Sequence, residues 1–340
     1  MAPSLRAGRG TNVAILVLLS GAVATGTLAT AIGGGWSTWA VVAHGVIGVT
    51  LVVIAPWKSV ISRRGVRRRG RSAGPSLLLA LLIVVAIGAG VAHAAGVGEV
   101  WVLPVRALWL HVAAALCAIP LAIWHVIARR TLPRRTDLSR RALLRGGAAL
   151  AVGGAAYVAV EGAIAGLGLS GGRRRYTGSH EAGSFEPTAM PTTIWLDDSR
   201  PAIDPANHSV VVATSTGRRE WSVPELAGFG DDLRATLDCT SGWFATQDWT
   251  GVRLDRLLGD ADGRSVVVRS VTGYARRFPL SDAARILLAT HAGDTPLDAG
   301  HGAPVRLVAP GRRGFWWVKW VESVAVEDTP WWWQPPFPLS

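Results

Sequence analysis

The sequence predicts an all-α membrane bundle followed by an α+β domain that is mainly β, and three observations lead to this fold class. Mean hydropathy is +0.30 and 49% of the 340 residues are hydrophobic, which is more apolar than an ordinary soluble protein. Long apolar runs are confined to residues 1–170, and short alternating segments replace them from residue 191. The formal charge changes in the same region, from +17 on residues 1–175 to −5 on residues 176–340.

Five apolar runs are long enough to cross about 30 Å of hydrocarbon as helices. They cover residues 11–32, 38–60, 75–97, 105–128 and 143–168. Arginines crowd the connections after the second and fourth runs: Arg63, Arg64, Arg67, Arg68, Arg69 and Arg71, then Arg129, Arg130, Arg134, Arg135, Arg140, Arg141 and Arg145. The opposite connections hold a single Arg together with Trp36 and Trp101. By the positive-inside rule the arginine-rich connections are cytoplasmic, so we expect the chain after residue 168 to lie outside the cytoplasm.

The segment that leads into the fifth run, Leu138 to Arg145, reads LSRRALLR. Followed by a weakly hydrophobic Ala/Gly stretch, it resembles a twin-arginine export signal. The alternative is an ordinary basic flank of a membrane helix. A twin-arginine signal would export the following domain already folded, which suits a protein that must acquire a cofactor in the cytoplasm.

After a polar linker at residues 171–190, the pattern is that of a globular domain over residues 191–328, and a Trp/Pro-rich tail follows at 329–340. Alternating segments predict strands at 193–196, 209–214, 265–271, 305–308 and 318–326. Short helices are expected at 223–229, 253–258 and 281–288. This mixture is typical of an α+β domain weighted toward β.

Two motifs in this domain carry chemical information. The first is Leu237-Asp238-Cys239-Thr240-Ser241-Gly242-Trp243, followed by the run Trp249 to Leu254. The second is Gly300-His301-Gly302-Ala303-Pro304-Val305-Arg306, followed by Gly314-Phe315 and Val318-Lys319-Trp320-Val321. A lone Cys at the end of a strand is either inert and buried or a thiolate ligand to a soft metal. Chemistry alone leaves both readings of Cys239 open.

In this order and spacing the two motifs resemble the sulfite-oxidase fold, the molybdopterin domain of sulfite oxidases and periplasmic methionine-sulfoxide reductases. The resemblance covers roughly residues 190–328. It implies a molybdenum–molybdopterin cofactor, with Cys239 as the metal's thiolate ligand, and an oxidoreductase that transfers oxygen in a two-electron step. It also implies cofactor contacts from Tyr176, Ser270, Thr272, His301, Arg306, Arg312 and Lys319, and a catalytic role for Tyr274. The alternative for the charged residues is that they are solvated surface charges, and the alternative for Tyr274 is that it packs in the core.

One departure from the family concerns the substrate. Sulfite oxidases place an Arg a few residues after the ligand Cys, whereas here Arg253 is the first Arg after Cys239. The cationic clamp for a sulfur oxyanion is therefore incomplete. Trp243, four residues after Cys239, is instead similar to the sulfoxide-reductase branch. We expect a small substrate, which need not be sulfite. In the sulfoxide-reductase branch the substrate contains sulfur.

Four histidines fall within the apolar runs, where ionisable residues are functional candidates: His44, His93, His111 and His125. The first three lie near the outer ends of their runs, and His111 and His125 are separated by about four helical turns on one face. That spacing is similar to the heme ligands of b-type cytochromes, although Lys58 stands where His44 would need a matching inner ligand. The sequence predicts one outer heme b held by two of the first three. The alternative is that all four hydrogen-bond within the bundle.

Charge placement argues against a nucleic-acid-binding protein, because the basic residues sit in short connections between apolar runs. Two cysteines, Cys117 and Cys239, provide no disulfide framework. The expected partners are the bilayer, a small substrate and a quinone or redox protein that exchanges electrons through the membrane part, with the chain itself a monomer. The alternatives are a non-catalytic anchored module that keeps the fold, and a membrane sensor or transporter.

Overall fold

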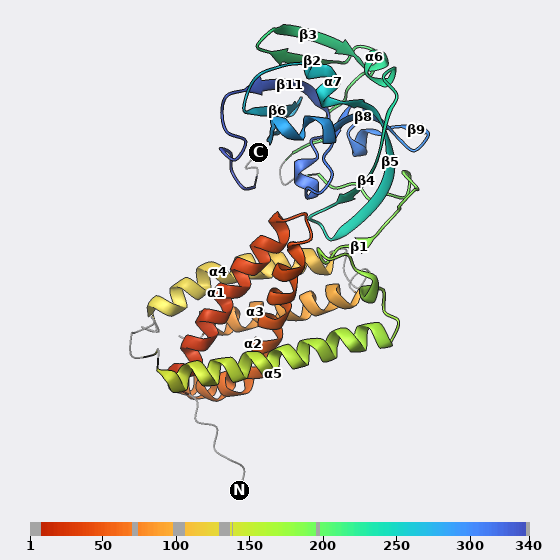
Figure 1. The fold of residues 1–340 in the computed structure, drawn as a ribbon. Helices are drawn as coiled ribbons and strands as arrows, with labels where there is room; N and C mark the ends of the chain where they lie inside the picture. Colours follow the sequence, from red (N-terminus) through yellow and green to blue (C-terminus); the bar gives the residue numbers. More distant parts are fainter. Residues whose placement is uncertain are drawn as a thin grey trace. The chain divides into compact units, whose positions relative to one another are not determined.

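The computed structural model describes residues 8–69, 74–97, 106–128, 137, 139–194 and 198–337, with no side chains described at 64–69. The chain divides into two compact units, residues 1–29 with 36–178, and residues 30–35 with 179–340. The first unit is helical and the second contains all the strands (Figure 1). The predicted fold class, a membrane-type helical bundle followed by a mainly β domain, is confirmed.

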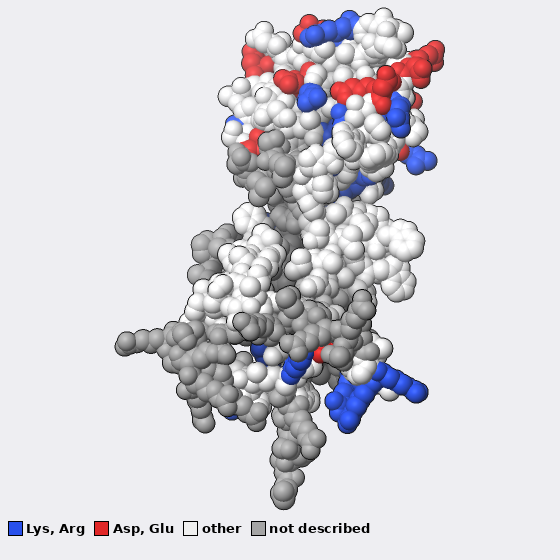
Figure 2. Space-filling model, turned by 90° about the vertical axis from the view of Figure 1, so that its left-hand side faces the viewer, with Lys and Arg blue, Asp and Glu red and all other residues white. Residues whose placement is uncertain are grey.

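The helical unit contains α1 (Arg9–Ala31), α2 (Ser37–Arg69), α3 (Gly74–Ala95), α4 (Ala107–Ala128) and α5 (Arg140–Gly166). Within the described residues, these five helices are long and apolar enough to cross a membrane. α2 continues beyond the predicted end of its span because arginine is a good helix former. On the face shown in Figure 2, the charged side chains that are visible on this unit gather toward one end. Residues 70–73 and 129–136 with their arginines, and Trp101 in 98–105, lie outside the described residues.

Glycines let helices of this unit approach one another closely. α3 packs against α4, and α2 packs against α5. A Cβ atom placed on Gly153 of α5 would lie 1.9 Å from Thr50 Oγ1 and 3.1 Å from Thr50 Cα on α2. A Cβ on Gly45 of α2 would lie 2.4 Å from Tyr157 Cε2 on α5. Small residues of this kind allow backbone-to-backbone packing, which is a principal source of helix association in lipid.

We predict that Gly153→Ala destabilises the helical unit by about 1–3 kcal/mol, because the added methyl group meets the α2 backbone and Thr50 cannot move away from it completely. Gly154→Ala is the matched control, since a Cβ on Gly154 meets nothing within 4 Å and makes the same change in helix propensity. Thermal unfolding of the full chain in detergent, followed through its helical signal, measures both. Equal midpoints for the two variants would contradict the packing argument.

The second unit contains two sheets. The six-stranded sheet has the order β1-β5-β8-β10, with β4 paired to β5 and β9 to β8: β1 (His180–Glu181), β4 (Asp231–Asp238), β5 (Trp243–Arg253), β8 (Leu287–Ala292), β9 (Thr295–Pro296) and β10 (Arg306–Val308). The five-stranded sheet has the order β3-β2-β11-β6-β7: β2 (Ser209–Thr214), β3 (Gly217–Ser222), β6 (Ser265–Ser270), β7 (Ala275–Pro279) and β11 (Val321–Glu327). Side chains from both sheets form one buried core, which includes Val210, Trp249 and Val268.

The helices of this unit are short, and several of them directly follow a strand. They are α6 (Val223–Ala227), α7 (Leu254–Leu258) and 3-10 turns that include η4 (Leu280–Arg285), η5 (Ala299–His301) and η6 (Gly314–Trp316). Ser222 and Glu225 close the start of α6 with a capping box, which explains why its beginning was predictable. Between the units, α5 ends at Gly166 and β1 begins at His180, with the 3-10 turn η3 (Ser170–Arg173) between them.

Two expected elements differ from the structure. Thr193 and Ile194 have no strand conformation, and Trp195 and Leu196 lie outside the described residues. The segment at 281–288 is not an α-helix, because it consists of the end of η4 and the start of β8. In β8 the apolar residues Leu287, Leu288 and Ala289 are buried on both faces of the sheet, so their sequence has no alternation that would distinguish a strand from a helix.

Candidate active site

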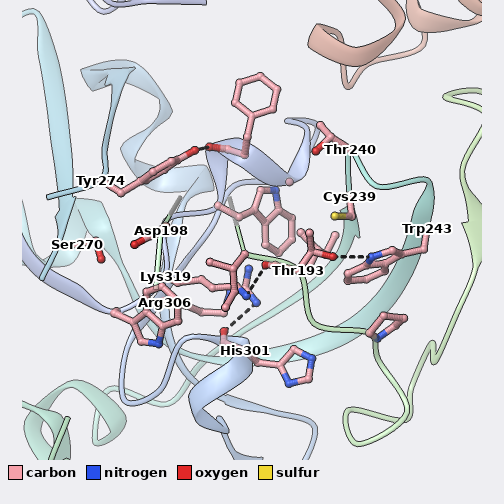
Figure 3. Close-up of a pocket in the computed structure, with 17 residues that line it drawn as sticks. Thr193, Asp198, Cys239, Thr240, Trp243, Ser270, Tyr274, His301, Arg306 and Lys319 are labelled. Carbon is pink, nitrogen blue, oxygen red and sulfur yellow. Dashed lines mark hydrogen bonds between the residues drawn. The ribbon is translucent and has the colours of Figure 1, made fainter. Parts of the chain in front are cut away.

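One cavity of the second unit gathers the chemistry of both sequence motifs. Together with the open solvent at its mouth, it holds about 670 Å³ of space. Its walls come from loops at strand ends and from the irregular segment at residues 191–194 (Figure 3). The polar and sulfur-bearing residues that line it are Thr193, Asp198, Cys239, Thr240, Ser270, Tyr274, His301, Arg306 and Lys319, among aromatic residues that include Trp243, Phe315, Trp317 and Trp320.

Cys239 occupies the first position of the tight loop that joins β4 to β5. The loop closes through two backbone bonds, from Cys239 N to Trp243 O at 2.8 Å and from Gly242 N to Cys239 O at 3.1 Å. Gly242 has φ +92°, a conformation that favours glycine, which explains the Gly in the motif. Cys239 is buried, and its Sγ lies 3.1 Å from Ser241 Oγ. The hairpin therefore holds the thiol at the cavity wall.

A buried ion pair fixes the backbone next to this thiol. Arg313 Nη1 donates to Asp238 Oδ1, and its Nη2 donates to Cys239 O at 3.2 Å. Ser179 Oγ donates to the same Asp238 oxygen at 2.7 Å. The two charged side chains retain only 4% and 3% of their accessible surface. Gly314 makes this approach possible, because a Cβ there would lie 3.1 Å from Cys239 Cα.

Arg306 is the most deeply buried cation of the cavity. Its guanidinium carbon lies 5.0 Å from the ring centre of Trp249 and 5.5 Å from that of Trp317. Nη1 donates to His301 O at 3.0 Å, whereas the buried Nε has no hydrogen-bond partner among the described residues. Burial lowers the pKa of Arg306 to about 10. A guanidinium that remains charged here, with an unused donor, is suited to an anionic ligand.

Lys319 adds a second cation beside Arg306. Its Nζ donates to Thr193 O at 2.9 Å and to Gly300 O at 2.5 Å, both of which are neutral acceptors. Burial, reinforced by the charge of Arg306, lowers the pKa of Lys319 to about 7. An anion in the cavity would favour the ammonium form and raise that pKa again. Gly302, with φ +102°, lets the two cationic side chains lie close, because a Cβ there would be 3.0 Å from Lys319 Cβ and 3.1 Å from Arg306 Cβ.

His301 contributes to the cavity mainly through its backbone. Its Nδ1 lies 2.6 Å from Asp298 Oδ2 and its Nε2 lies 3.0 Å from Met190 O, so both ring nitrogens face protein acceptors. Figure 3 shows the ring turned away from Cys239. Burial lowers the pKa of His301, while the Asp298 carboxylate opposes that shift. In this arrangement the imidazole of His301 orders η5, and the backbone carbonyl of His301 accepts a hydrogen bond from Arg306.

Tyr274 and Ser270 lie at the turn between β6 and β7. The Tyr274 hydroxyl donates to Phe315 O, and burial raises the pKa of Tyr274 well above its usual range. Its proton is therefore retained at neutral pH, and the group acts as a donor. Ser270 Oγ accepts from Thr272 Oγ1 at 3.1 Å, and Thr272 itself does not line the cavity.

Two other predicted cofactor residues do not line this cavity. Arg312 pairs with Asp282 at 3.0 Å and lies over the rings of Trp316 and Trp331. Tyr176 belongs to the helical unit, where Arg175 Nη2 donates to its hydroxyl at 2.9 Å. Their cofactor contacts stay predictions.

Three residues of the site were not singled out from the sequence. Of two adjacent arginines the sequence analysis named Arg312, although it is Arg313 that reaches Cys239. Asp198 lines the cavity and its charge acts on Tyr274, but nothing in its sequence surroundings marks it. Thr193 lies in a segment that was expected to be a strand, and its hydroxyl accepts from Trp243 Nε1 at 3.2 Å. No common sequence signal would have identified all three.

We predict that Arg313→Leu lowers the free energy of unfolding of the second unit by about 3–5 kcal/mol, because the buried Asp238 loses its counter-ion. The neighbouring Arg312→Leu is the matched control. It breaks a half-exposed pair with Asp282, and should lower stability by only about 1 kcal/mol. Denaturant unfolding of the full chain, read through tryptophan fluorescence, distinguishes the two. A larger loss for Arg312→Leu would overturn the assignment of the structural pair.

The sequence of this domain matches that of a known family. Residues 198–333 match the oxidoreductase molybdopterin-binding domain. The match includes Cys239, His301, Arg306 and Lys319, the residues on which both motifs depend.

Individual relatives also match part of the chain. Mitochondrial sulfite oxidases of Rattus norvegicus and Mus musculus are each 35% identical over 108 residues, and that of Homo sapiens is 32% identical over 107 residues. These matches cover 27% of this chain and 20% of each relative, so the chain spans about a fifth of the length of the curated relatives. A solved structure, the sulfane dehydrogenase SoxCD from Paracoccus pantotrophus, matches at 22% identity with a TM-score of 0.36, over 38% of this chain and 40% of that one.

Proposed function

We propose that this chain is a membrane-anchored molybdenum oxidoreductase, because residues 198–333 match the oxidoreductase molybdopterin-binding domain. It would catalyse a two-electron oxygen-atom transfer on a small substrate. The observation that carries the proposal is the convergence of the Cys239 thiol with two buried cations, Arg306 and Lys319, on one cavity. A soft sulfur ligand and fixed positive charge are what a molybdenum–pterin phosphate cofactor requires.

The residues present fit such a group. The buried Arg306 Nε has no partner among the described residues, and Lys319 Nζ bonds to two backbone carbonyls, those of Thr193 and Gly300. Asp298 pairs with His301, and among the described residues neither Arg306 nor Lys319 forms an ion pair with a carboxylate. An anionic cofactor would supply the missing negative charge.

Within this proposal each residue has a distinct role. Cys239 Sγ would hold the metal, and Arg306 and Lys319 would hold the anionic part of the cofactor. When bound, the molybdenum centre supplies the two-electron oxygen transfer. Tyr274 keeps its proton and can donate to a substrate oxygen if it releases the Phe315 carbonyl. The aromatic walls formed by Trp243, Trp317 and Trp320 keep water from the reacting groups.

The charges of the cavity bear on the substrate. Asp198 lines the cavity and interacts electrostatically with Tyr274, so a carboxylate borders the space where a substrate would meet the hydroxyl. Together with the missing Arg after Cys239, this disfavours a sulfur oxyanion. We therefore favour a small uncharged substrate such as a sulfoxide over sulfite.

The helical unit supports an anchor with the domain outside the cytoplasm. The arginines of the two connections follow the positive-inside pattern, and the twin arginines, Arg140 and Arg141, are the first two residues of α5. Ser139 caps α5 by accepting from Ala142 N at 3.2 Å, which starts the helix directly at Arg140. Export of a folded domain through this signal would allow the cofactor to be inserted first.

We predict that Cys239→Ser abolishes molybdenum-dependent turnover while leaving the amount of folded protein unchanged, because a hard and poorly ionised hydroxyl replaces a soft thiolate. Cys117→Ser, which changes the other thiol and lies in α4, is the matched control and should keep full activity. The measurements are metal content by mass spectrometry and a panel of dye-linked assays with sulfoxides and sulfite. Full activity in Cys239→Ser would refute the ligand assignment.

Molybdenum content also separates the competing functions. A wild-type chain that purifies folded and without molybdenum would be a non-catalytic anchored module that keeps the fold. A chain that binds a ligand through its helices and shows no redox activity would be a sensor or transporter.

We further propose that the helical unit binds one b-type heme through His44 and His111, which would pass electrons between the domain and a quinone or redox protein. The ring centres of these histidines lie 5.7 Å apart, with planes at 88°. Metal–imidazole bonds of about 2 Å would place two rings on opposite sides of one ion at roughly this separation. His125 lies elsewhere, with its Nδ1 at 3.2 Å from Ser76 Oγ.

The tautomers of the pair support metal ligation. His44 Nδ1 lies 3.0 Å from Ala22 O, and His111 Nδ1 lies 2.7 Å from Ala86 O. A carbonyl is an acceptor, so each Nδ1 carries a proton and each Nε2 keeps its lone pair for a metal, as is usual for ligating histidines. Within the described residues no group of three or more His, Cys, Asp and Glu could hold a metal ion, so the proposal rests on this pair alone.

We predict that purified full-length protein shows the sharp α band of a low-spin heme when reduced, and that His111→Ala removes it. His44→Ala should do the same, whereas His125→Ala should retain the band. Reduced-minus-oxidised spectra of the three variants, with molybdenum content as a measure of an intact domain, test this. Folded protein without heme absorbance, made in heme-sufficient cells, would leave the bundle as an anchor only.

A further inference from the structure

A chain of three hydrogen bonds leads through the protein to the sulfur of Cys239. Trp243 Nε1 lies 3.2 Å from Thr193 Oγ1, which lies 3.1 Å from Ser241 Oγ, which in turn lies 3.1 Å from Cys239 Sγ. Figure 3 shows the bond between Thr193 and Trp243, with Cys239 close to both at the wall of the cavity. Trp243 and Ser241 are buried, so water does not compete freely for these groups.

The chemistry of the four groups gives this chain a single direction when Cys239 is a thiolate. An indole N–H is only a donor, so Trp243 donates to Thr193. A ligating thiolate has no proton and is only an acceptor, so Ser241 donates to Cys239. The Ser241 hydroxyl has then used its one proton and accepts from Thr193. Every hydroxyl donates once and accepts once within the chain, which leaves none of its protons undirected.

We infer that Ser241 and Thr193 are positioning residues that tune the electron-donor strength of the Cys239 thiolate toward the metal. This inference rests on the proposed function. A hydrogen bond to a ligating sulfur withdraws negative charge from it and stabilises the reduced state of the metal, which raises the reduction potential. The Thr193 hydroxyl strengthens the bond from Ser241, because a hydroxyl that accepts a hydrogen bond becomes a better donor.

Thr193 also connects this chain of hydrogen bonds to Lys319, the cation that would hold the anionic part of the cofactor. Its carbonyl accepts from Lys319 Nζ at 2.9 Å while its hydroxyl accepts from Trp243. Thr193 is therefore held at both its backbone and its side chain, although it belongs to no strand. A residue that only filled space at this position would not need a hydroxyl oriented toward Ser241.

The test is a redox titration of the molybdenum signal in the full chain with its cofactor, followed by electron paramagnetic resonance. Ser241→Ala should shift the midpoint potential to a more negative value, and Thr193→Val should shift it in the same direction by less. Ser241→Thr and Thr193→Ser keep the hydroxyls and should restore the wild-type potential. The sulfur-to-molybdenum charge-transfer band should move to lower energy in Ser241→Ala, because the thiolate becomes a stronger donor.

Molybdenum content and thermal midpoint are measured on each variant, which separates tuning from a loss of fold or cofactor. A Ser241→Ala protein with full molybdenum content, unchanged potential and unchanged charge-transfer band would overturn the inference and leave the proposed function intact. A folded wild-type chain that contains no molybdenum would overturn both. Equal shifts from Ser241→Ala and Ser241→Thr would also contradict it, because the effect would then follow side-chain shape and not the hydroxyl.

Discussion

The buried ion pair of Asp238 and Arg313 is the interaction on which the candidate active site depends. It joins the end of β4 to the loop after β10, and the same guanidinium holds the carbonyl of Cys239. A buried pair of this kind gives little net stability relative to an apolar pair, because both charges lose their hydration. What it provides is a unique arrangement, since an alternative register of these loops would leave two buried charges without partners. The position of the thiol is thus specified by electrostatics in the protein core.

Desolvated positive charge is the second constraint on the cavity. Arg306 lies near two tryptophan rings, and Lys319 bonds to two carbonyls, so both cations are held away from water. The reduced pKa values of both groups express the same penalty. A cavity with this charge is less stable empty than when it holds an anion, which links the folding of the domain to the binding of an anionic ligand.

The sequence allowed the fold class to be predicted, and the reasons are local. Apolar length determines the five spans, and strands such as β2 and β6 show clear β-branched runs between turn residues. The hairpin of β4 and β5 was not predicted, because its pairing becomes visible only once both strands are placed. Thr193 was misassigned because its segment has the composition of a strand, whereas Thr193 and Ile194 have no strand conformation.

The site residues also divide into those that local sequence predicts and those that depend on the tertiary fold. Cys239, Arg306 and Lys319 lie in motifs whose residues are close in sequence, and the structure brings them to one cavity. Arg312 and Arg313 cannot be distinguished by local sequence, because only the turn geometry decides which guanidinium faces Asp238 and which faces Asp282. Contacts between distant segments, such as that of Thr193 with Ser241, depend on the tertiary fold and leave no pattern in the sequence.

The short connection between α5 and β1 limits how far the two units can separate. Residues 167–179 join α5 to β1, and even a fully extended chain of that length spans at most about 45 Å. The local concentration of the second unit around the bundle is therefore set by this connection and not by the amount of protein in the membrane. Any electron exchange between the units would be first order, with a rate that is insensitive to dilution of the protein in lipid.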